Sequence, residues 1–132
     1  MLIKEELDTP FVKLDKENGV LSIIGKSYTD NPTDFYVPIV DVLHELNNTT
    51  QNNNFTVKVA LEIINSISSK YLFFLFKILY DMYDELVVKW YYESDDEIMF
   101  EMGKSFKGTF TESDFNLIGV TDLREVFLIK LM

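Results

Sequence analysis

The chain has 132 residues, of which 47% are hydrophobic and 14% aromatic, enough to bury the core of one ordinary domain. Its formal net charge of −10 repels phosphate backbones and anionic lipid, which argues against nucleic acid and membrane surfaces as partners. The absence of cysteine excludes disulfides, thiolate metal sites and cysteine nucleophiles.

The first signal along the chain is a β-hairpin. Residues 11–14 and 20–24 are β-rich runs, and the Asn18-Gly19 pair lies between them. This pair supplies the positive φ angles of a tight turn, so the two runs predict one antiparallel pair of strands.

A helix start follows the hairpin. Asn31 is its expected cap, and Pro32 occupies the first helical position, where an N–H is not needed. Pro38 conflicts with an unbroken helix, so the helix either kinks there or is regular only from near Val37. The apolar residues of this helix share one face: Phe35, Ile39, Val42, Leu43 and Leu46.

A strand and a long helix occupy the middle of the chain. Residues 47–54 are polar and predict a loop, and the alternation after them predicts a strand. Its core face is Phe55, Val57, Val59, Leu61 and Ile63. Residues 71–83 are apolar around nearly the whole helical circumference, so we expect burial on more than one side. The main core face of that helix is Leu72, Leu75, Phe76 and Leu79.

The last expected elements are a strand and a helix. Residues 86–92 are β-rich, and alternation should bury Trp90 and Tyr92 while exposing Tyr91. Ser94 and Glu97 fit a capping box at the start of a helix. Its apolar residues are Ile98, Met99, Met102 and Phe106. The tail is ambiguous, and residues 125–132 fit either strand or helix.

This alternation of strands and helices predicts an α/β fold. We expect a single-layer mixed sheet of about four strands, made of the opening hairpin and a right-handed β-α-β crossover, packed with helices. The N-terminus lacks a secretion signal, and the most apolar run, residues 71–80, is shorter than the roughly 20 residues of a membrane span. We therefore expect one domain over residues 1–132, cytoplasmic and without membrane insertion.

The sequence offers few groups for catalysis. His44 is the only histidine, and a lone helical histidine without a partner is more often a surface or packing residue. A zinc site lacks ligands, and the five glycines are scattered rather than gathered in a phosphate loop. Residues 93–97 could hold Mg²⁺ through carboxylates, although helix capping explains them better. We predict no enzyme, no cofactor and no metal.

A serine cluster, Ser66, Ser68 and Ser69, stands where the middle strand gives way to the long helix. Backbone N–H groups at a helix start have no partner within the helix, and the helix dipole is positive there. A hydroxyl at this place can cap the helix, or it can carry a phosphate whose charge is stabilised. Position alone favours the cap by about four to one.

Five blocks of the chain stand in an order that is specific as a set. They are Thr9-Pro10 through Asp15, Glu17-Asn18-Gly19-Val20-Leu21, Asp34-Phe35-Tyr36 with Pro38, Asn65-Ser66 with Ser68-Ser69-Lys70, and Trp90-Tyr91-Tyr92-Glu93 with Asp95-Asp96. On these blocks the chain resembles the SiaC family of bacterial regulatory phosphoproteins over about residues 8–118. Residues 119–132 form a C-terminal extension that the resemblance does not explain.

The resemblance implies a fold similar to the anti-sigma-factor antagonist (STAS-like) domains and no catalytic activity. It also implies a Ser/Thr kinase of the SiaB type that phosphorylates the protein and a PP2C-type phosphatase that removes the phosphate. The dephosphorylated protein would bind and activate a diguanylate cyclase or other effector protein, raising cyclic di-GMP and promoting biofilm formation. The family carries its phosphate on a threonine after asparagine, and the matching residue here is Ser66; Ile67 stands where the family usually has serine.

We therefore predict that Ser66 is phosphorylated and that an effector binds at the strand-to-helix corner. The expected partner-binding residues are Asn65, Ser68, Ser69, Lys70 and Phe74, with Ser68 and Ser69 also supporting the cap. The alternative is a small-ligand-binding domain with a pocket near Ser66, Trp90 and residues 93–97, or a purely structural α/β domain without a phosphoswitch.

Overall fold

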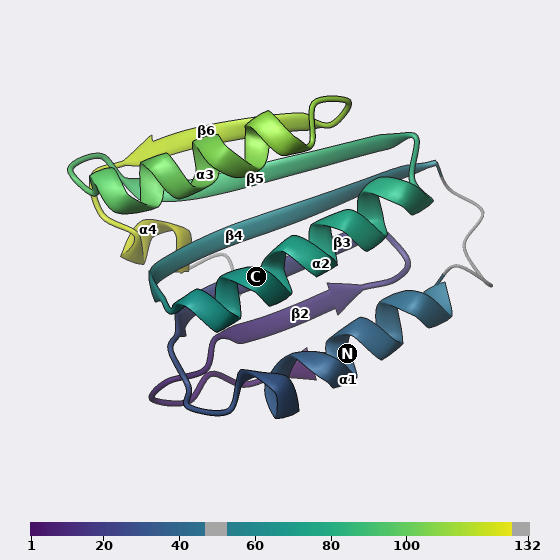
Figure 1. Ribbon diagram of the computed structural model, residues 1–132, viewed down its shortest axis with the longest axis horizontal. Coiled ribbons are helices and arrows are strands. Elements are labelled where there is room, and N and C mark those ends of the chain that lie inside the picture. Colours follow the sequence, from purple (N-terminus) through teal and green to yellow (C-terminus); the bar gives the residue numbers. More distant parts are fainter. Residues whose placement is uncertain (47–52, 128–132) are drawn as a thin grey trace.

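The computed structural model describes residues 1–46 and 53–127, which form an α/β fold around one mixed sheet (Figure 1). The strands are β1 (Leu2–Ile3), β2 (Phe11–Asp15), β3 (Val20–Ser27), β4 (Asn54–Ile64), β5 (Glu85–Glu93) and β6 (Asp114–Val120). The helices are α1 (Pro32–Leu46), α2 (Ser66–Met82), α3 (Glu97–Thr109) and α4 (Arg124–Phe127). Most of the loop expected at residues 47–54 lies outside the described residues, and Asn54 already belongs to β4.

The six strands lie side by side in chain order. The pairs β1–β2 and β2–β3 are antiparallel, and the pairs from β3 to β6 are parallel. The predicted hairpin and the parallel β-α-β unit are confirmed. The expectation of about four strands is too low, because it omits β1, which has only two residues, and β6, which lies in the tail that the sequence left ambiguous.

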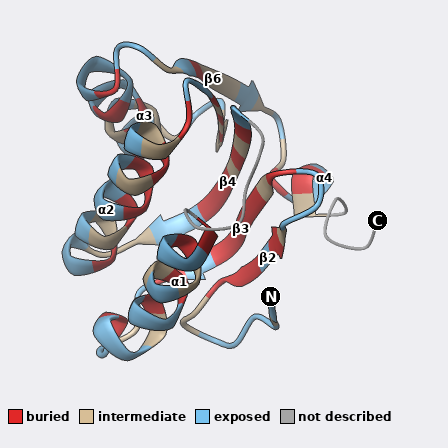
Figure 2. Cartoon of the chain, turned by 90° about the vertical axis from the view of Figure 1, so that its right-hand side faces the viewer, coloured by how far each residue is buried: buried red, intermediate tan, exposed pale blue. Residues whose placement is uncertain are grey.

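The two faces of the sheet are covered unequally. Helices α1, α2 and α3 lie on one face, and the short α4 lies on the other (Figure 2). Each of the three long helices connects neighbouring parallel strands, and crossovers of one hand along a sheet that grows in one direction place all helices on the same face. The larger core therefore lies between the sheet and α1–α3.

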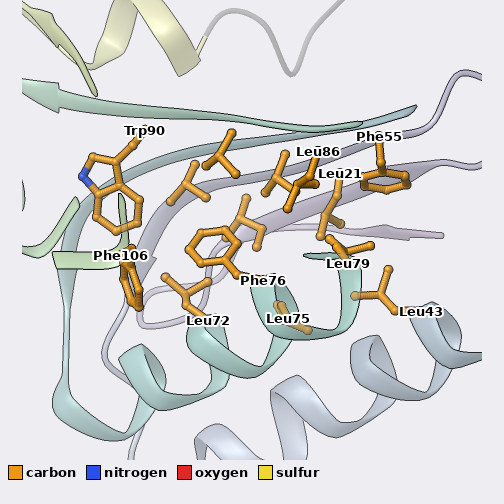
Figure 3. Close-up of a cluster of buried hydrophobic side chains, with 14 of the residues drawn as sticks. Leu21, Leu43, Phe55, Leu72, Leu75, Phe76, Leu79, Leu86, Trp90 and Phe106 are labelled. Atoms are coloured by element: carbon orange, nitrogen blue, oxygen red, sulfur yellow. The ribbon is translucent and has the colours of Figure 1, made fainter. Parts of the chain in front are cut away.

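The core face predicted for α2 is confirmed, since Leu72, Leu75, Phe76 and Leu79 are all buried against the sheet (Figure 3). Trp90 is fully buried in the same core, where it packs on Phe106 and donates its Nε1–H to the carbonyl of Met99 at 2.9 Å. Gly103 approaches this ring so closely that a Cβ there would lie 2.5 Å from Trp90 Cδ1.

The alternation of β4 is interrupted near its end. Gly25 pairs with Leu61 and Lys26 pairs with Ile63, so Glu62 is an extra residue on the β4 side. Such a bulge reverses the faces of the residues after it. Ile63 is consequently 48% exposed, and Ile64 packs against the core instead. The prediction that Ile63 faces the core is wrong for this reason.

Helix α1 begins at Pro32 and continues through Pro38, so the alternative of a regular helix starting near Val37 is wrong. Asn31 caps it, accepting a hydrogen bond from the N–H of Asp34 at 3.4 Å. The buried face contains Tyr36 rather than the predicted Phe35, which is only partly buried.

The start of α3 differs from the predicted capping box. The N-cap is Asp96, whose carboxylate accepts from the N–H of Met99 at 3.1 Å. Ser94 instead donates its hydroxyl to the carbonyl of Val120 at 3.1 Å. Asp caps a helix as well as Ser does, and the turn after β5 places Asp96, not Ser94, before the first helical residue. Among the apolar residues of this helix, Met99 and Phe106 are buried, whereas Ile98 is 77% exposed.

The second face of the sheet carries a smaller apolar cluster. Leu123 and Val126, around α4, pack there against Phe11, Ile24 and Ala60. Tyr91 packs against the same cluster and is half-buried, so the expectation that it is exposed holds only in part. Within the described ranges no helix combines the length and the apolar character of a membrane span.

Candidate functional site

The residues expected to carry function lie where β4 ends and α2 begins. Asn65 is the N-cap of α2, with an extended backbone at φ −88° and ψ 170°. Its Oδ1 accepts the N–H of Ser68 at 2.9 Å, and its Nδ2 donates to the carbonyl of Thr29 at 3.1 Å. Asn65 therefore holds the helix start and also ties it to the segment before α1.

Ser66 is the first residue of α2, and its side chain is exposed. The first turn of this helix contains no acidic residue, so the positive end of the helix dipole is not neutralised from within the helix. A phosphate ester on this hydroxyl would be accessible to a modifying enzyme and would meet backbone N–H groups that have no intrahelical partner.

The other two serines do not act as expected. The cap is supplied by Asn65, so the prediction that Ser68 and Ser69 support it is wrong. Ser68 is fully buried, and its Oγ has no hydrogen-bond partner of suitable geometry among the described residues. Ser68 therefore occupies a packing position and not a partner contact. Ser69 is half-buried and donates its hydroxyl to the carbonyl of Ser66 at 2.7 Å.

Aromatic residues of α1 and α2 join the two helix starts. The rings of Tyr36 and Tyr71 are stacked, with centroids 5.3 Å apart and an angle of 5° between their planes. Tyr71 donates its hydroxyl to Thr33 Oγ1 at 2.7 Å, and Tyr36 shares a 2.6 Å hydrogen bond with Ser27 Oγ. Burial raises the pKa of Tyr36 to about 12, although its contacts with the hydroxyls of Ser27 and Ser68 act in the opposite direction. The corner is thus held by contacts from both helices and from β3.

An apolar stripe begins beside Ser66. We define it as Ile67 and Phe74, seven positions apart on α2, together with the adjacent Phe73. Ile67 is 52% and Phe74 53% exposed, and Lys70 lies exposed between them. The expectation that α2 is buried on more than one side holds in part, because Tyr71 and Tyr80 pack on neighbouring elements whereas the stripe is open. Exposed aromatic and aliphatic groups that gather on one surface are typical of a protein interface.

The sequence did not identify Ile67 or Phe73 as contact residues. Ile67 stands where the family usually has serine, so it was noted only as a difference from the family. Its spacing of seven residues from Phe74 already indicates that the two side chains share one helical face. Thr29 and Thr33 were also missed, because their contacts with α2 join residues more than thirty positions apart.

The structure does not bring the expected ligand pocket together. Trp90 faces the interior, so it cannot line an open cavity beside Ser66. Asp96 is engaged as a helix cap. Over residues 1–46 and 53–127 there is no group of three or more His, Asp or Glu side chains placed to hold a metal ion.

Replacing Asn65 with Ala is expected to lower the free energy of unfolding by about 1 kcal/mol, because the variant loses the cap acceptor. Urea unfolding followed by circular dichroism measures the change. Asn65→Asp is the comparison variant, since it keeps an acceptor for the N–H of Ser68, loses the donor to Thr29 and adds a charge that the helix dipole favours. Equal losses in both variants would show that the tie to Thr29, and not the cap, holds the corner.

The chain resembles known proteins in a family model and in its fold. A family model described as "SiaC family regulatory phosphoprotein" matches residues 3–120. No curated protein matches the chain by sequence. The crystal structure of apo-SiaC from Pseudomonas aeruginosa is similar with a TM-score of 0.76 at 19% identity, covering 89% of this chain and 95% of that one.

A second similar structure is that of the diguanylate cyclase SiaD in complex with its activator SiaC, also from Pseudomonas aeruginosa. The matched chain has a TM-score of 0.75 at 20% identity, and the match covers 89% of this chain and 96% of that one. At these identities the structural likeness establishes the fold.

Proposed function

Because the chain belongs to the SiaC family of regulatory phosphoproteins, we propose that it is a non-enzymatic partner-switching regulator controlled by phosphate on Ser66. The unphosphorylated form binds an effector, and the phosphorylated form is released. The Pseudomonas aeruginosa SiaC is an activator found in complex with a diguanylate cyclase, which makes a diguanylate cyclase the proposed effector here. The supporting observation is the exposed Ser66 hydroxyl at the start of α2, beside the apolar stripe.

The fold should tolerate the modified side chain. A phosphate adds about −1.5 to −2 charges at neutral pH. At the first position of α2 this charge meets free backbone N–H groups and the positive end of the dipole, without an acidic neighbour in the first helical turn. Phosphorylation of Ser66 therefore leaves the corner folded and changes only what the surface presents.

The same charge opposes binding. An effector seated on Ile67 and Phe74 would cover Ser66 as well, because all three residues lie within the first half of one helix. Asn65, Ser69 and Lys70 complete the proposed contact surface around them. Burying a doubly charged phosphate in such an interface requires removal of its water. A penalty of ~3 kcal/mol weakens binding by about two decades.

The switch requires one enzyme that adds the phosphate and another that removes it. We propose a Ser/Thr kinase of the SiaB type and a PP2C-type phosphatase, acting with the protein in the cytoplasm. The exposed position of Ser66 suits both, since each must bring its active site to the hydroxyl. Cyclic di-GMP is the proposed output of the activated cyclase.

Purification of the tagged full chain from its native organism, followed by phosphosite mapping of free and effector-bound fractions, tests this function. We expect phosphate on Ser66 in the free fraction and its absence from the fraction that carries a diguanylate cyclase. Ser105, exposed on α3, serves as the internal control and should be equally unmodified in both fractions. Phosphate on Ser66 at equal occupancy in both fractions would contradict the switch.

A further inference from the structure

Three lysines lie in one row across the sheet face that α1–α3 leave uncovered. The register pairs Lys13 with Ser22, Ser22 with Lys58, and Lys58 with Lys89. Neighbours of these lysines along the strands, such as Val57 and Val88, belong to the core under the helices. Because side chains alternate between the faces of a strand, the lysines point to the opposite face, the one that carries α4 (Figure 2). We call Lys13, Lys58 and Lys89 the lysine row.

Two members of the lysine row are neighbours of like charge. Lys58 and Lys89 are direct partners on adjacent strands, and like charges in such positions repel. The ion pairs found among the described residues hold other cations: Lys26 with Glu62, Lys77 with Asp81 and Arg124 with Asp122.

The nearest carboxylates on this face are already engaged. Asp15 lies two residues from Lys13, but it accepts hydrogen bonds from the N–H and Nδ2 of Asn18 at 3.1 and 2.8 Å. These bonds, more than Lys13, hold the pKa of Asp15 below its usual value. At the other end of the row, Asp114 accepts from Asn116 Nδ2 at 3.3 Å.

The surroundings of the lysine row are apolar on one side. On the same face of the sheet, two positions further along each strand toward α4, lie Phe11, Ile24, Ala60 and Tyr91. They belong to or pack against the smaller cluster. Parallel strands are normally covered by helices on both faces of the sheet. Among the described residues, α4 is the only helix on this face, and it packs on the smaller cluster. The positively charged lysine row therefore lies beside the smaller apolar cluster, on a chain whose formal net charge is −10.

We propose that the lysine row is a docking site for an acidic segment of a partner protein. Three steps between strands separate Lys13 from Lys89, a span of about 14 Å. In an extended segment the side chains on one face repeat every ~6.7 Å, so three alternate carboxylates span ~13 Å, close to the length of the row. The middle lysine, Lys58, lies two strand steps from Lys13 and one from Lys89, an offset that the flexible lysine side chains can bridge. The overall negative charge repels anions that do not make this local match.

This site is separate from the proposed effector surface, because the lysine row and the apolar stripe lie on opposite faces of the sheet. A segment bound at the row leaves α2 free. The two surfaces can therefore be occupied together, and failure of one proposal leaves the other standing.

The probe is the peptide Asp-Val-Asp-Val-Asp-Val-amide with fluorescein on its N-terminal nitrogen, and fluorescence anisotropy at low ionic strength measures its binding to the full chain. The test variant is K13Q/K58Q/K89Q, and the matched control is K4Q/K104Q/K107Q, which makes the same change in net charge at exposed lysines elsewhere. We expect the test variant to lose about tenfold or more in affinity and the control to lose less than about twofold. No binding to the wild type, or equal losses in both variants, would overturn the proposal.

Four further measurements distinguish an acidic protein segment from a nucleic acid, a lipid surface, a second copy of the chain and a purely structural role. Tighter, row-dependent binding of oligothymidine or of phosphatidylserine vesicles than of the peptide would overturn the choice of an acidic protein segment. Row-dependent dimers in sedimentation would identify the occupant as a second copy and overturn it too. The melting temperature of K13Q/K58Q/K89Q should equal or exceed that of the wild type, because repulsion is removed. A clear fall would assign the lysines a structural role and reject the docking site.

Discussion

Ser66→Asp is expected to weaken effector binding by about tenfold or more, and full phosphorylation by about a hundredfold, whereas Ser66→Ala should bind as the unphosphorylated wild type does. One carboxylate carries less charge than a phosphate, which sets the order of the two effects. Isothermal titration with the diguanylate cyclase of the native organism measures all three affinities.

The controls for this series separate binding from folding. An acidic residue at the first position of α2 interacts favourably with the helix dipole, so Ser66→Asp should leave the free energy of unfolding unchanged or raise it by up to about 1 kcal/mol. Ser105→Asp adds the same charge at an exposed position on α3 and should leave effector binding unchanged. If Ser66→Asp and Ser66→Ala bind every candidate effector equally well, the switch proposal is wrong.

Gly103→Ala is expected to lower the free energy of unfolding by about 2 kcal/mol, although alanine favours a helix over glycine by about 1 kcal/mol. The new Cβ would lie 2.5 Å and 2.6 Å from Trp90 Cδ1 and Nε1, and 2.8 Å from Leu117 Cδ2. The Trp90 ring cannot move away easily, because its Nε1–H is hydrogen-bonded to the carbonyl of Met99 and the ring packs on Phe106. Thermal and urea unfolding measure the loss.

Gly108→Ala provides the matched control on the same helix. A Cβ at Gly108 meets no atom within 4 Å, so only the helix preference acts and stability should rise by up to about 1 kcal/mol. Opposite signs for the two glycines would show that close packing against Trp90, and not helix preference, governs Gly103. A gain in stability at both positions would mean that the indole ring moves aside at little cost.

Elements set by local chemistry were predictable from the sequence. The hairpin was predictable from Asn18-Gly19, although only Gly19 has the expected positive φ, at 67°, and Asn18 does not. The start of α1 follows from Pro32 and its preceding cap. In each case a few adjacent residues contain the whole physical cause.

Features that depend on partners distant in the chain were not predictable in this way. The bulge at Glu62 exists only relative to β3, so the exposure of Ile63 could not be read from β4 alone. The burial of Ser68 depends on how α2 packs, whereas its sequence neighbours suggested a surface cluster. The cap was expected from a hydroxyl of the serine cluster, but Asn65 supplies it, and Asn and Ser cap helices about equally well.

The strand order has a consequence for how the chain assembles. Every strand pairs with its immediate predecessor, so no strand has to wait for a partner from a later β-α unit. Only the antiparallel pairings are local, because each parallel pairing has to enclose a whole helix, and such crossovers form more slowly than a hairpin does. The sheet can therefore grow by one β-α unit at a time from the N-terminal hairpin as the protein emerges from the ribosome, with β6 and α4 joining last.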